Sequence, residues 1–111
     1  LPTTEAEALK IQHGDAMELL SLHVVDAWQG TGTALLAEAA RVARERGCRR
    51  LWLVTTNANT SALRFYQKCG FVLCALRVDA VALSRKIKPE IPLAGEAGIP
   101  IRDELELEML L

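Results

Sequence analysis

A short glycine turn is the first feature of this sequence that could bind a ligand. Gly30-Thr31-Gly32-Thr33 follows an apolar run and precedes a helical pattern. Glycines allow a tight turn there, and the first amide N–H groups of the helix, at the positive end of its dipole, favour an anion such as a phosphate. A strand-to-helix turn without any ligand explains the same residues equally well. The turn taken by itself leaves both interpretations open.

Two nucleotide-binding motifs that use glycine turns lack their defining residues here. A P-loop requires Gly-x-x-x-x-Gly-Lys-Ser/Thr, and this turn contains no lysine. A dinucleotide fingerprint needs a third glycine where Leu35 stands, and an acidic residue at the end of the next strand, where the chain has Thr55 and Thr56. The sequence therefore matches neither motif.

Apolar patterns around the turn predict strands and a helix in alternation. Residues 17–25 are apolar and β-prone, which predicts a strand covered on both faces, and residues 9–13 are its candidate hairpin partner across Gly14-Asp15. Residues 33–46 have the apolar spacing of an amphipathic helix, and residues 51–55 form a second β-prone run. A strand, helix and strand in this order predict a right-handed crossover that joins a parallel pair.

The second half of the chain repeats this alternation. We expect a helix over residues 59–68, a strand over residues 71–78 and a short helix over residues 79–88. Residues 89–100 contain three prolines and two glycines, which predicts a loop. Residues 104–111 alternate between glutamate and apolar residues, which predicts a strand with solvated glutamates and an inward face of Leu105, Leu107 and Met109.

Length and composition exclude several classes of protein. A chain of 111 residues can bury roughly 65% of its unfolded surface in one core. Its net charge of -1 argues against nucleic-acid binding, and no apolar run approaches the ~20 residues of a membrane span. Three cysteines without metal-site spacing fit reduced thiols. We therefore expect a cytoplasmic protein that binds no metal, nucleic acid or membrane.

A second segment resembles the signature of the GNAT superfamily of acyl-coenzyme A transferases. Asn59-x-x-Ala62-x-x-Phe65-Tyr66-x-x-x-Gly70-Phe71 lies one strand–helix–strand step after the glycine turn, as in that family. The resemblance covers residues 17–78. The stretch from Lys88-Pro89-Glu90-Ile91-Pro92 to Gly98-Ile99-Pro100-Ile101-Arg102-Asp103-Glu104-Leu105-Glu106 is also similar to the ending of one bacterial branch of acetyltransferases.

The resemblance implies an α/β (α+β) fold with a mixed, mostly antiparallel, twisted sheet. A central parallel pair, formed by the strands at Met17 and Leu51, would splay apart. The usual N-terminal strand and helices are expected to be missing, since at most one early strand fits before Met17. We expect one domain with four parts: a remnant or linker (1–16), a coenzyme A-binding core (17–78), a helix and loop (79–102) and a final strand (103–111).

The resemblance also implies that acetyl-coenzyme A binds where the parallel pair splays. Its pyrophosphate would lie on the turn amides, and strand backbone and Asn59 would bind its pantetheine arm. Two registers of the turn stay open: residues 30–36 match the family's Gly-x-Gly-x-Ala-Leu-Leu without a gap, or Gln29 takes the family's Arg/Gln position. The implied cofactor-binding residues are Leu22, Val24, Gln29, Gly30, Thr31, Gly32, Thr33, Asn59, Ala62 and Phe65.

Tyr66 matches the tyrosine of the family, which implies a catalytic proton donor to the departing thiolate. A phenol with a pKa near ~10 is a feasible donor to a thiolate whose acid has a pKa near ~8.5. A tyrosine that only packs its ring is the alternative, and Asn59 could likewise act as the N-cap of its helix. No base stands out from the candidates His23, Glu18, Asp103 and Glu104, and a water chain can replace a direct base.

Two function classes follow from the resemblance. The first is an N-acetyltransferase that moves an acetyl group from acetyl-coenzyme A to a primary amine of a small molecule or peptide, by direct attack in a ternary complex. The second is a coenzyme A-binding or assembly module without turnover. A thiol-release assay combined with a coenzyme A titration distinguishes them.

We expect the chain to form a homo-oligomer, most simply a dimer. The missing N-terminal layer would leave apolar strand and helix faces uncovered, and a second copy can cover them. Sedimentation at micromolar concentration should therefore give a mass above that of one chain. A monomer at every concentration, with no binding of a hydrophobic dye, would contradict this expectation.

Overall fold

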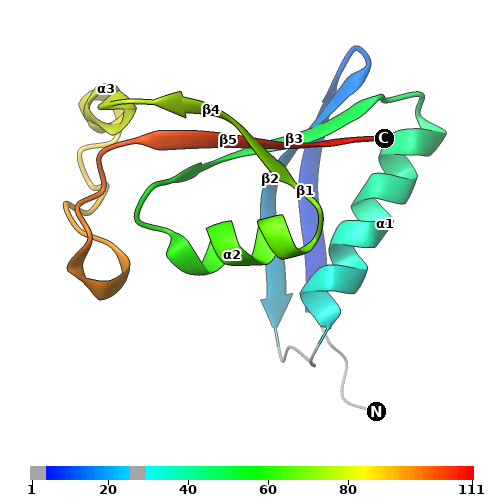
Figure 1. The fold of residues 1–111 in the computed structure, drawn as a ribbon, viewed down its shortest axis with the longest axis horizontal. Coiled ribbons are helices and arrows are strands. Elements are labelled where there is room, and N and C mark those ends of the chain that lie inside the picture. The colour runs from blue at the N-terminus through cyan, green and yellow to red at the C-terminus, as the bar shows by residue number, and fades with distance from the viewer. Residues whose placement is uncertain (1–4, 26–29) are drawn as a thin grey trace. The chain divides into compact units, whose positions relative to one another are not determined.

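The computed structural model describes the backbone of residues 5–25 and 30–111, and the side chains of residues 8–22 and 30–111. The described strands follow the order β1-β2-β3-β5-β4, with β2 and β3 parallel. This confirms the mixed sheet with one parallel pair that the sequence predicted. The elements are β1 (Glu5–His13), β2 (Ala16–Val25), α1 (Thr31–Glu45), β3 (Arg50–Thr56), α2 (Thr60–Lys68), β4 (Val72–Arg77), α3 (Ala80–Ile87), a 3-10 turn (Glu96–Gly98) and β5 (Glu104–Leu110) (Figure 1).

The chain divides into two compact units. Unit 1 contains the residues up to Leu53 together with Met109–Leu111, and unit 2 contains Val54–Glu108, so β3 runs from one into the other. In unit 1, β1 and β2 form an antiparallel hairpin that turns at Gly14 and Asp15. The hairpin confirms the predicted pairing, and β1 starts four residues earlier than the predicted partner strand because Glu5–Ala8 also pairs with β2.

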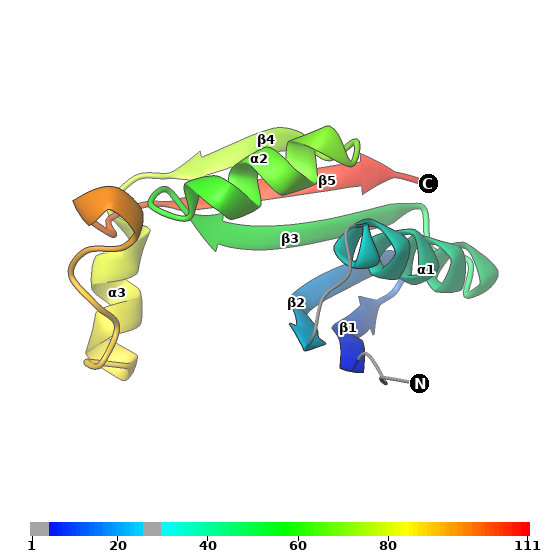
Figure 2. The ribbon, with the colours of Figure 1, turned by 90° about the horizontal axis from the view of Figure 1, so that it is seen from below.

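Helix α1 packs against the β1–β2 hairpin (Figures 1 and 2). Its buried side chains recur on one stripe: Leu36, Ala39, Ala40 and Ala43. In β2, Met17 and Leu19 are buried, whereas Leu20 is 51% exposed. The prediction that this strand is covered on both faces is therefore wrong for the side chains described. Because nearly all residues of the strand are apolar, the sequence does not show that only one of its faces is buried.

The parallel pairing joins the start of β2 to the start of β3. Met17 lies opposite Leu51, and both side chains are fully buried. The Arg49 N–H donates to the Asp15 carbonyl (2.6 Å), which ties the end of the α1–β3 connection to the hairpin turn. The pairs described end at Glu18 and Trp52, although both strands continue. The predicted adjacency of these two strands is confirmed.

In unit 2, β4 pairs antiparallel with β5, and the register shifts between Leu73 and Ala75. Helix α2 runs along these two strands (Figure 2). The sequence predicted a second strand–helix–strand step, but the strand order places β5 between β3 and β4. The crossover through α2 therefore skips one position in the sheet, which the last strand then fills.

The acidic face of β5 is not simply solvated, contrary to the prediction. Arg77 of β4 forms an ion pair with Glu106, whose side chain is only 13% exposed. Ser84 of α3 donates its hydroxyl hydrogen to Glu104 (3.1 Å). On the other face Leu107 is fully buried, as the alternation predicted. The glutamates of β5 thus contact side chains of β4 and α3.

Side chains, rather than regular structure, hold the segment of residues 88–103 in place. The Arg85 guanidinium donates to three carbonyl oxygens of the segment, those of Ile91, Pro92 and Ile101. The Asn57 carboxamide bonds three of its backbone groups: the Pro100 carbonyl and the Arg102 and Asp103 amides. Backbone groups that lack a partner in a helix or strand are satisfied in this way.

Asp103 joins this segment to the start of α3. Its buried carboxylate accepts hydrogen bonds from the Asp79 N–H (2.9 Å) and from the Arg102 guanidinium (2.9 and 3.0 Å). The Arg102 guanidinium, with help from the Asp79 N–H, holds the pKa of Asp103 below its usual value. A carboxylate with a lowered pKa is a weaker base. Asp103 therefore has a structural role, although the sequence placed it among the candidate bases.

Replacement of Asp103 by asparagine should lower the Tm at pH 7 and weaken its dependence on acid. Because the folded-state pKa lies below the unfolded value of ~3.9, ionised Asp103 stabilises the fold above about pH 4 and loses this effect as the pH falls through the folded-state pKa. Thermal unfolding followed by circular dichroism should show a smaller fall of Tm below about pH 4 in Asp103→Asn than in the wild type.

Asp79→Asn is the matched control for this measurement. The Asp79 side chain is 69% exposed and lies 3.8 Å from Arg102 Nε, too far for a hydrogen bond. This variant should keep the acid dependence of the wild type. An equal loss of acid dependence in both variants would show that the buried Asp103 contacts are not its source.

Candidate functional site

Helix α1 begins directly after Gly30. Gly30 has a φ of 87°, in the left-handed region that favours glycine, and its carbonyl accepts the first helical hydrogen bond from the Ala34 N–H (3.0 Å). Gly30, at the N-cap position, has no side chain with which to cap this end of α1. Thr31, Gly32 and Thr33 form the first turn, at the positive end of the helix dipole. The turn thus has the features of an anion site, while Gln29 lies outside the described residues.

Leu22 and Val24 lie in the second half of β2. Their described neighbours are on β1, with Leu22 opposite Ala8 and Val24 opposite Ala6. Both residues lie beyond Glu18, the last residue of β2 with a described partner on β3. The structure therefore places these two predicted backbone contacts in the part of β2 that continues past the parallel pairing.

Asn59 stands at the start of α2, but its side chain does not cap the helix. The Asn59 Nδ2 group donates to Thr55 Oγ1 (3.1 Å), and only the backbone carbonyl takes part in the helix, accepting from the Leu63 N–H (3.0 Å). Asn59 Oδ1 has no hydrogen-bond partner among the described residues. The exposed carboxamide can therefore accept a hydrogen bond from a ligand.

A carboxylate from the distal loop caps α2 instead. Glu96 accepts hydrogen bonds from Thr60 Oγ1 (2.8 Å), from the Ser61 N–H (3.2 Å) and from Ser61 Oγ (2.6 Å). Donation by Ser61 and Thr60 lowers the pKa of Glu96 below its usual value, so the carboxylate is ionised at neutral pH. Sequence analysis missed this residue, because a cap 35 positions away along the chain leaves no local pattern.

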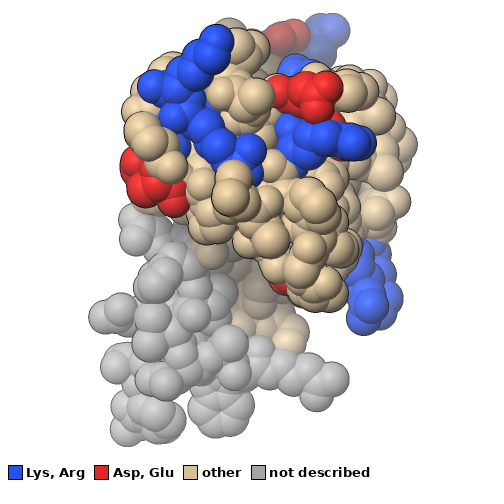
Figure 3. All heavy atoms as spheres, turned by 90° about the vertical axis from the view of Figure 1, so that its left-hand side faces the viewer, with Lys and Arg blue, Asp and Glu red and all other residues tan. Residues whose placement is uncertain are grey.

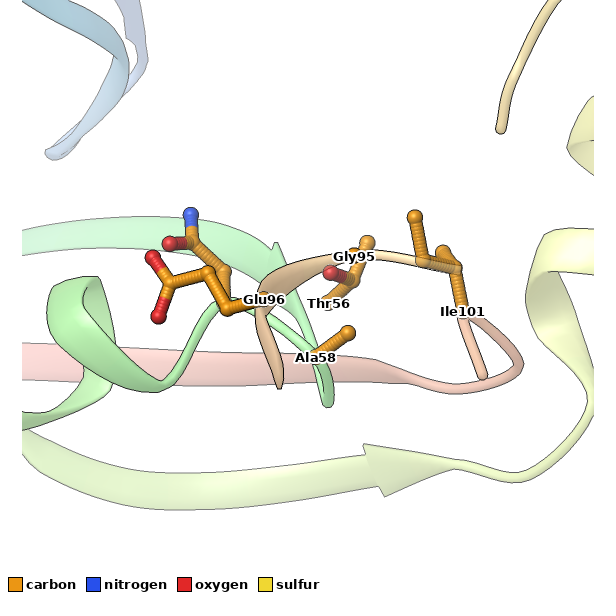
Figure 4. Close-up of a pocket in the computed structure, with 6 residues that line it drawn as sticks. Thr56, Ala58, Gly95, Glu96 and Ile101 are labelled. Atoms are coloured by element: carbon orange, nitrogen blue, oxygen red, sulfur yellow. The ribbon is translucent and has the colours of Figure 1, made fainter. Parts of the chain in front are cut away.

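An open pocket of about 240 Å³ lies beside this cap (Figure 4). Glu96 stands at one end and Ile101 at the other, with Thr56 between them (Figure 4). A Cβ atom on Gly95 would lie 3.0 Å from the Ala58 Cβ, which is a tighter contact than most Cβ atoms make. Gly95 therefore lets the loop approach the β3–α2 turn closely. The residues lining the pocket are Thr56, Ala58, Asn59, Gly95, Glu96 and Ile101.

Tyr66 lies two turns further along α2, between two other rings. Its ring makes edge-on contacts with Phe65 (centroids 5.3 Å apart) and with Phe71 (5.5 Å). Burial, with a smaller effect of Cys69, raises the pKa of Tyr66 above its usual value. Its hydroxyl has no hydrogen-bond partner among the described residues. The ring packing and a chemical role for the hydroxyl are therefore compatible, and Ala62 and Phe65 are half-buried on the same helix.

The other candidate bases are engaged or not described. Glu18 forms an ion pair with His13 (3.4 Å), and Glu104 accepts from Ser84. The side chain of His23 lies outside the described side chains. Each of the three carboxylates among the four candidates, Glu18, Asp103 and Glu104, therefore has a partner.

Charged and metal-binding groups do not gather into a second site in the described part of the chain. Among the described side chains, those of residues 8–22 and 30–111, no three His, Cys, Asp or Glu groups are placed to hold a metal ion. None of the described helices has the length and apolar character needed to cross a membrane. The face in Figure 3 carries separate basic and acidic side chains among uncharged ones, so it presents no continuous basic patch.

Comparison with known proteins agrees with this arrangement. A profile of the acetyltransferase (GNAT) family matches residues 6–71. The uncharacterized protein YxbD of Bacillus subtilis (strain 168) is 53% identical over 93 residues, and the chain spans 58% of the length of that relative and aligns over 84% of its own.

Two solved structures share the fold. A Bacillus subtilis acetyltransferase in complex with CoA has a TM-score of 0.79 at 24% identity, over 96% of this chain and 68% of that chain. A GNAT family acetyltransferase from Elizabethkingia anophelis with acetyl-CoA bound has a TM-score of 0.71 at 28% identity, over 87% of this chain and 61% of that chain. Both relatives therefore have the architecture described above, and each was solved with a coenzyme A ligand.

Proposed function

The chain belongs to the acetyltransferase (GNAT) family, and we propose that it transfers an acetyl group from acetyl-coenzyme A to a primary amine of a small molecule or peptide. The observation that carries this proposal is that Asn59 Oδ1 and the Tyr66 hydroxyl, both in the family signature, have no partner among the described residues. Both atoms are therefore available to a ligand. The acetyl-CoA bound to the Elizabethkingia anophelis relative supports the choice of cofactor.

The residues present fit the chemistry of coenzyme A at two separate places. The first turn of α1 contains no acidic residue and lies at the positive end of the helix dipole, which suits the negative charge of a pyrophosphate. Asn59 Oδ1 can accept a hydrogen bond from an amide N–H of the pantetheine arm. When bound, acetyl-coenzyme A supplies the acyl group as a thioester. We propose that Leu22 and Val24 add backbone hydrogen bonds to the same arm, as in strand addition.

Tyr66 is the residue that we propose to act in the chemical step. The amine nitrogen forms a bond to the acyl carbon while the carbon–sulfur bond breaks, so the sulfur needs a proton and the amine must lose one. Tyr66 donates its hydroxyl proton to the sulfur, and its raised pKa keeps it protonated at neutral pH. The contacts with Phe65 and Phe71 hold the ring in one orientation.

We also propose that the protein acts as a homodimer. Apolar side chains on β4 are exposed, with Val72 64% and Leu76 60% accessible. Such side chains on an edge strand favour association with another surface. The sedimentation experiment described above tests this part of the proposal.

Replacement of Gly32 by valine should weaken coenzyme A binding. A branched side chain in the first turn of α1 would stand where the pyrophosphate approaches the backbone amides, even if the helix still forms. Isothermal titration with coenzyme A should give a higher Kd for Gly32→Val. Ala37→Val, on an exposed position one turn further along the same helix, is the matched control and should bind like the wild type. Equal Kd values for all three proteins would show that the turn does not bind coenzyme A.

Replacement of Tyr66 by phenylalanine should separate chemistry from binding. The ring and its contacts remain, so the Kd for coenzyme A should stay close to that of the wild type. Loss of the proton donor should lower the rate of thiol release, measured with a panel of primary amines, by ~10²-fold or more. Equal turnover of both proteins would exclude Tyr66 from the mechanism. If the wild type does not bind coenzyme A at millimolar ligand, the proposed function is wrong.

A further inference from the structure

The side chain that starts α2 and the side chain that caps it come from different parts of the chain. Asparagine is among the residues that cap helices best, because its side-chain oxygen accepts from the first backbone N–H groups. Asn59 holds the N-cap position, yet its carboxamide bonds Thr55 instead. The Ser61 N–H, which Asn59 Oδ1 would otherwise accept, donates to Glu96. Asn59 Oδ1 therefore makes no helix-capping hydrogen bond and stays available to a ligand.

Glu96 is well suited to replace that cap. Its carboxylate accepts one backbone and two hydroxyl hydrogen bonds, from Thr60 and Ser61. A negative charge at the start of a helix also interacts favourably with the helix dipole. With Glu96 in place, the Ser61 N–H is already satisfied, so Asn59 would gain no hydrogen bond to that group by turning toward the helix.

The loop delivers Glu96 to this position through contacts on both sides. The preceding residue, Gly95, lies so close to Ala58 that a Cβ at position 95 would make a tight contact of 3.0 Å with the Ala58 Cβ, and the Gly95 N–H donates to the Ile99 carbonyl (2.9 Å). Further along, Asn57 holds the Pro100 carbonyl (2.9 Å). The loop is therefore anchored to the β3–α2 turn, on which Asn59 itself lies.

We infer that Glu96 is a positioning residue for cofactor binding: by capping α2 in place of Asn59, it keeps the Asn59 carboxamide facing the ligand. This inference rests on the proposed function, because it assigns Asn59 to coenzyme A. Glu96 itself need not touch the cofactor. Without it, the Asn59 carboxamide would be drawn to the free Ser61 N–H, and binding would have to break that cap.

The test compares coenzyme A titrations of Glu96→Ala and Glu96→Gln with the wild type. Glu96→Ala should raise the Kd by about fivefold, the worth of one helix cap. Glu96→Gln should restore most of the affinity, because its amide oxygen can accept from the Ser61 N–H and its amide group can donate to the rotatable hydroxyls. Glu90→Ala, in the same loop and without a described hydrogen bond, is the matched control and should bind like the wild type.

Three outcomes of these titrations decide between positioning and a merely structural role. Partial unfolding would lower the number of binding sites and leave the Kd unchanged, and that result would overturn the inference. An unchanged Kd at full stoichiometry would overturn it as well. In the double variant Asn59→Ala/Glu96→Ala, affinity should fall no further than in Asn59→Ala, because Glu96 acts through Asn59. Additive losses would contradict this.

The proposed function and the inference fail in distinguishable ways. If the wild type does not bind coenzyme A, the function fails and the positioning role falls with it. If the wild type binds and Glu96→Ala binds equally well, only the inference fails. Amide hydrogen exchange at Ser61, measured by NMR without ligand, tests the cap separately. Exchange should be faster in Asn59→Ala/Glu96→Ala than in Asn59→Ala, where Glu96 alone accepts from this N–H, and equal rates would show that Glu96 does not cap α2.

Discussion

The backbone N–H groups in the first turn of α2 have no hydrogen-bond acceptor inside the helix. Much of unit 2 is arranged so that another residue supplies an acceptor. The acceptor is Glu96, 35 residues beyond Ser61. To bring its carboxylate there, the loop must lie close to the β3–α2 turn, where a Cβ on residue 95 would make a tight contact with Ala58. The hydrogen bonds of Asn57 and Arg85 then fix the rest of the segment. The Glu96 cap, the loop that carries it and the pocket beside it therefore depend on the same contacts.

The two helix starts that carry the candidate site have opposite electrostatic character. At the start of α1, Gly30 has no side chain to cap the helix and the first turn contains no acidic residue, so the positive end of the helix dipole suits an anion. At the start of α2, an ionised carboxylate already occupies that position. A phosphate would be repelled there, whereas a neutral amide group could bind the nearby Asn59 carboxamide.

Sequence patterns predicted those features that depend on neighbouring residues. The β1–β2 hairpin, the three helices and the Met17–Leu51 adjacency follow from local alternation and from the short crossover. The position of β5 between β3 and β4 depends on pairing between segments about thirty residues apart, for which the chain has no local signal. The Glu96 cap likewise joins residues that are far apart in the sequence, so no local pattern predicts it. Exposure of Leu20 could not be predicted either, because an apolar side chain in a strand does not show which face is covered.

The carboxylates nominated by the sequence are poor candidates for accepting the proton of an amine. Asp103 is held ionised by Arg102 and the Asp79 N–H, and its lowered pKa makes it a weaker base than a free aspartate. Glu18 and Glu104 each have a partner, His13 and Ser84. A primary amine is itself a far stronger base than any of these groups. Water is a weaker base still, so in the proposed reaction a chain of water molecules relays the proton of the amine to the solvent, and the protein contributes at the sulfur through Tyr66. In this proposal the chain has two tasks, to hold the thioester and to supply one proton. Asn59 Oδ1 is suited to the first task and the Tyr66 hydroxyl to the second.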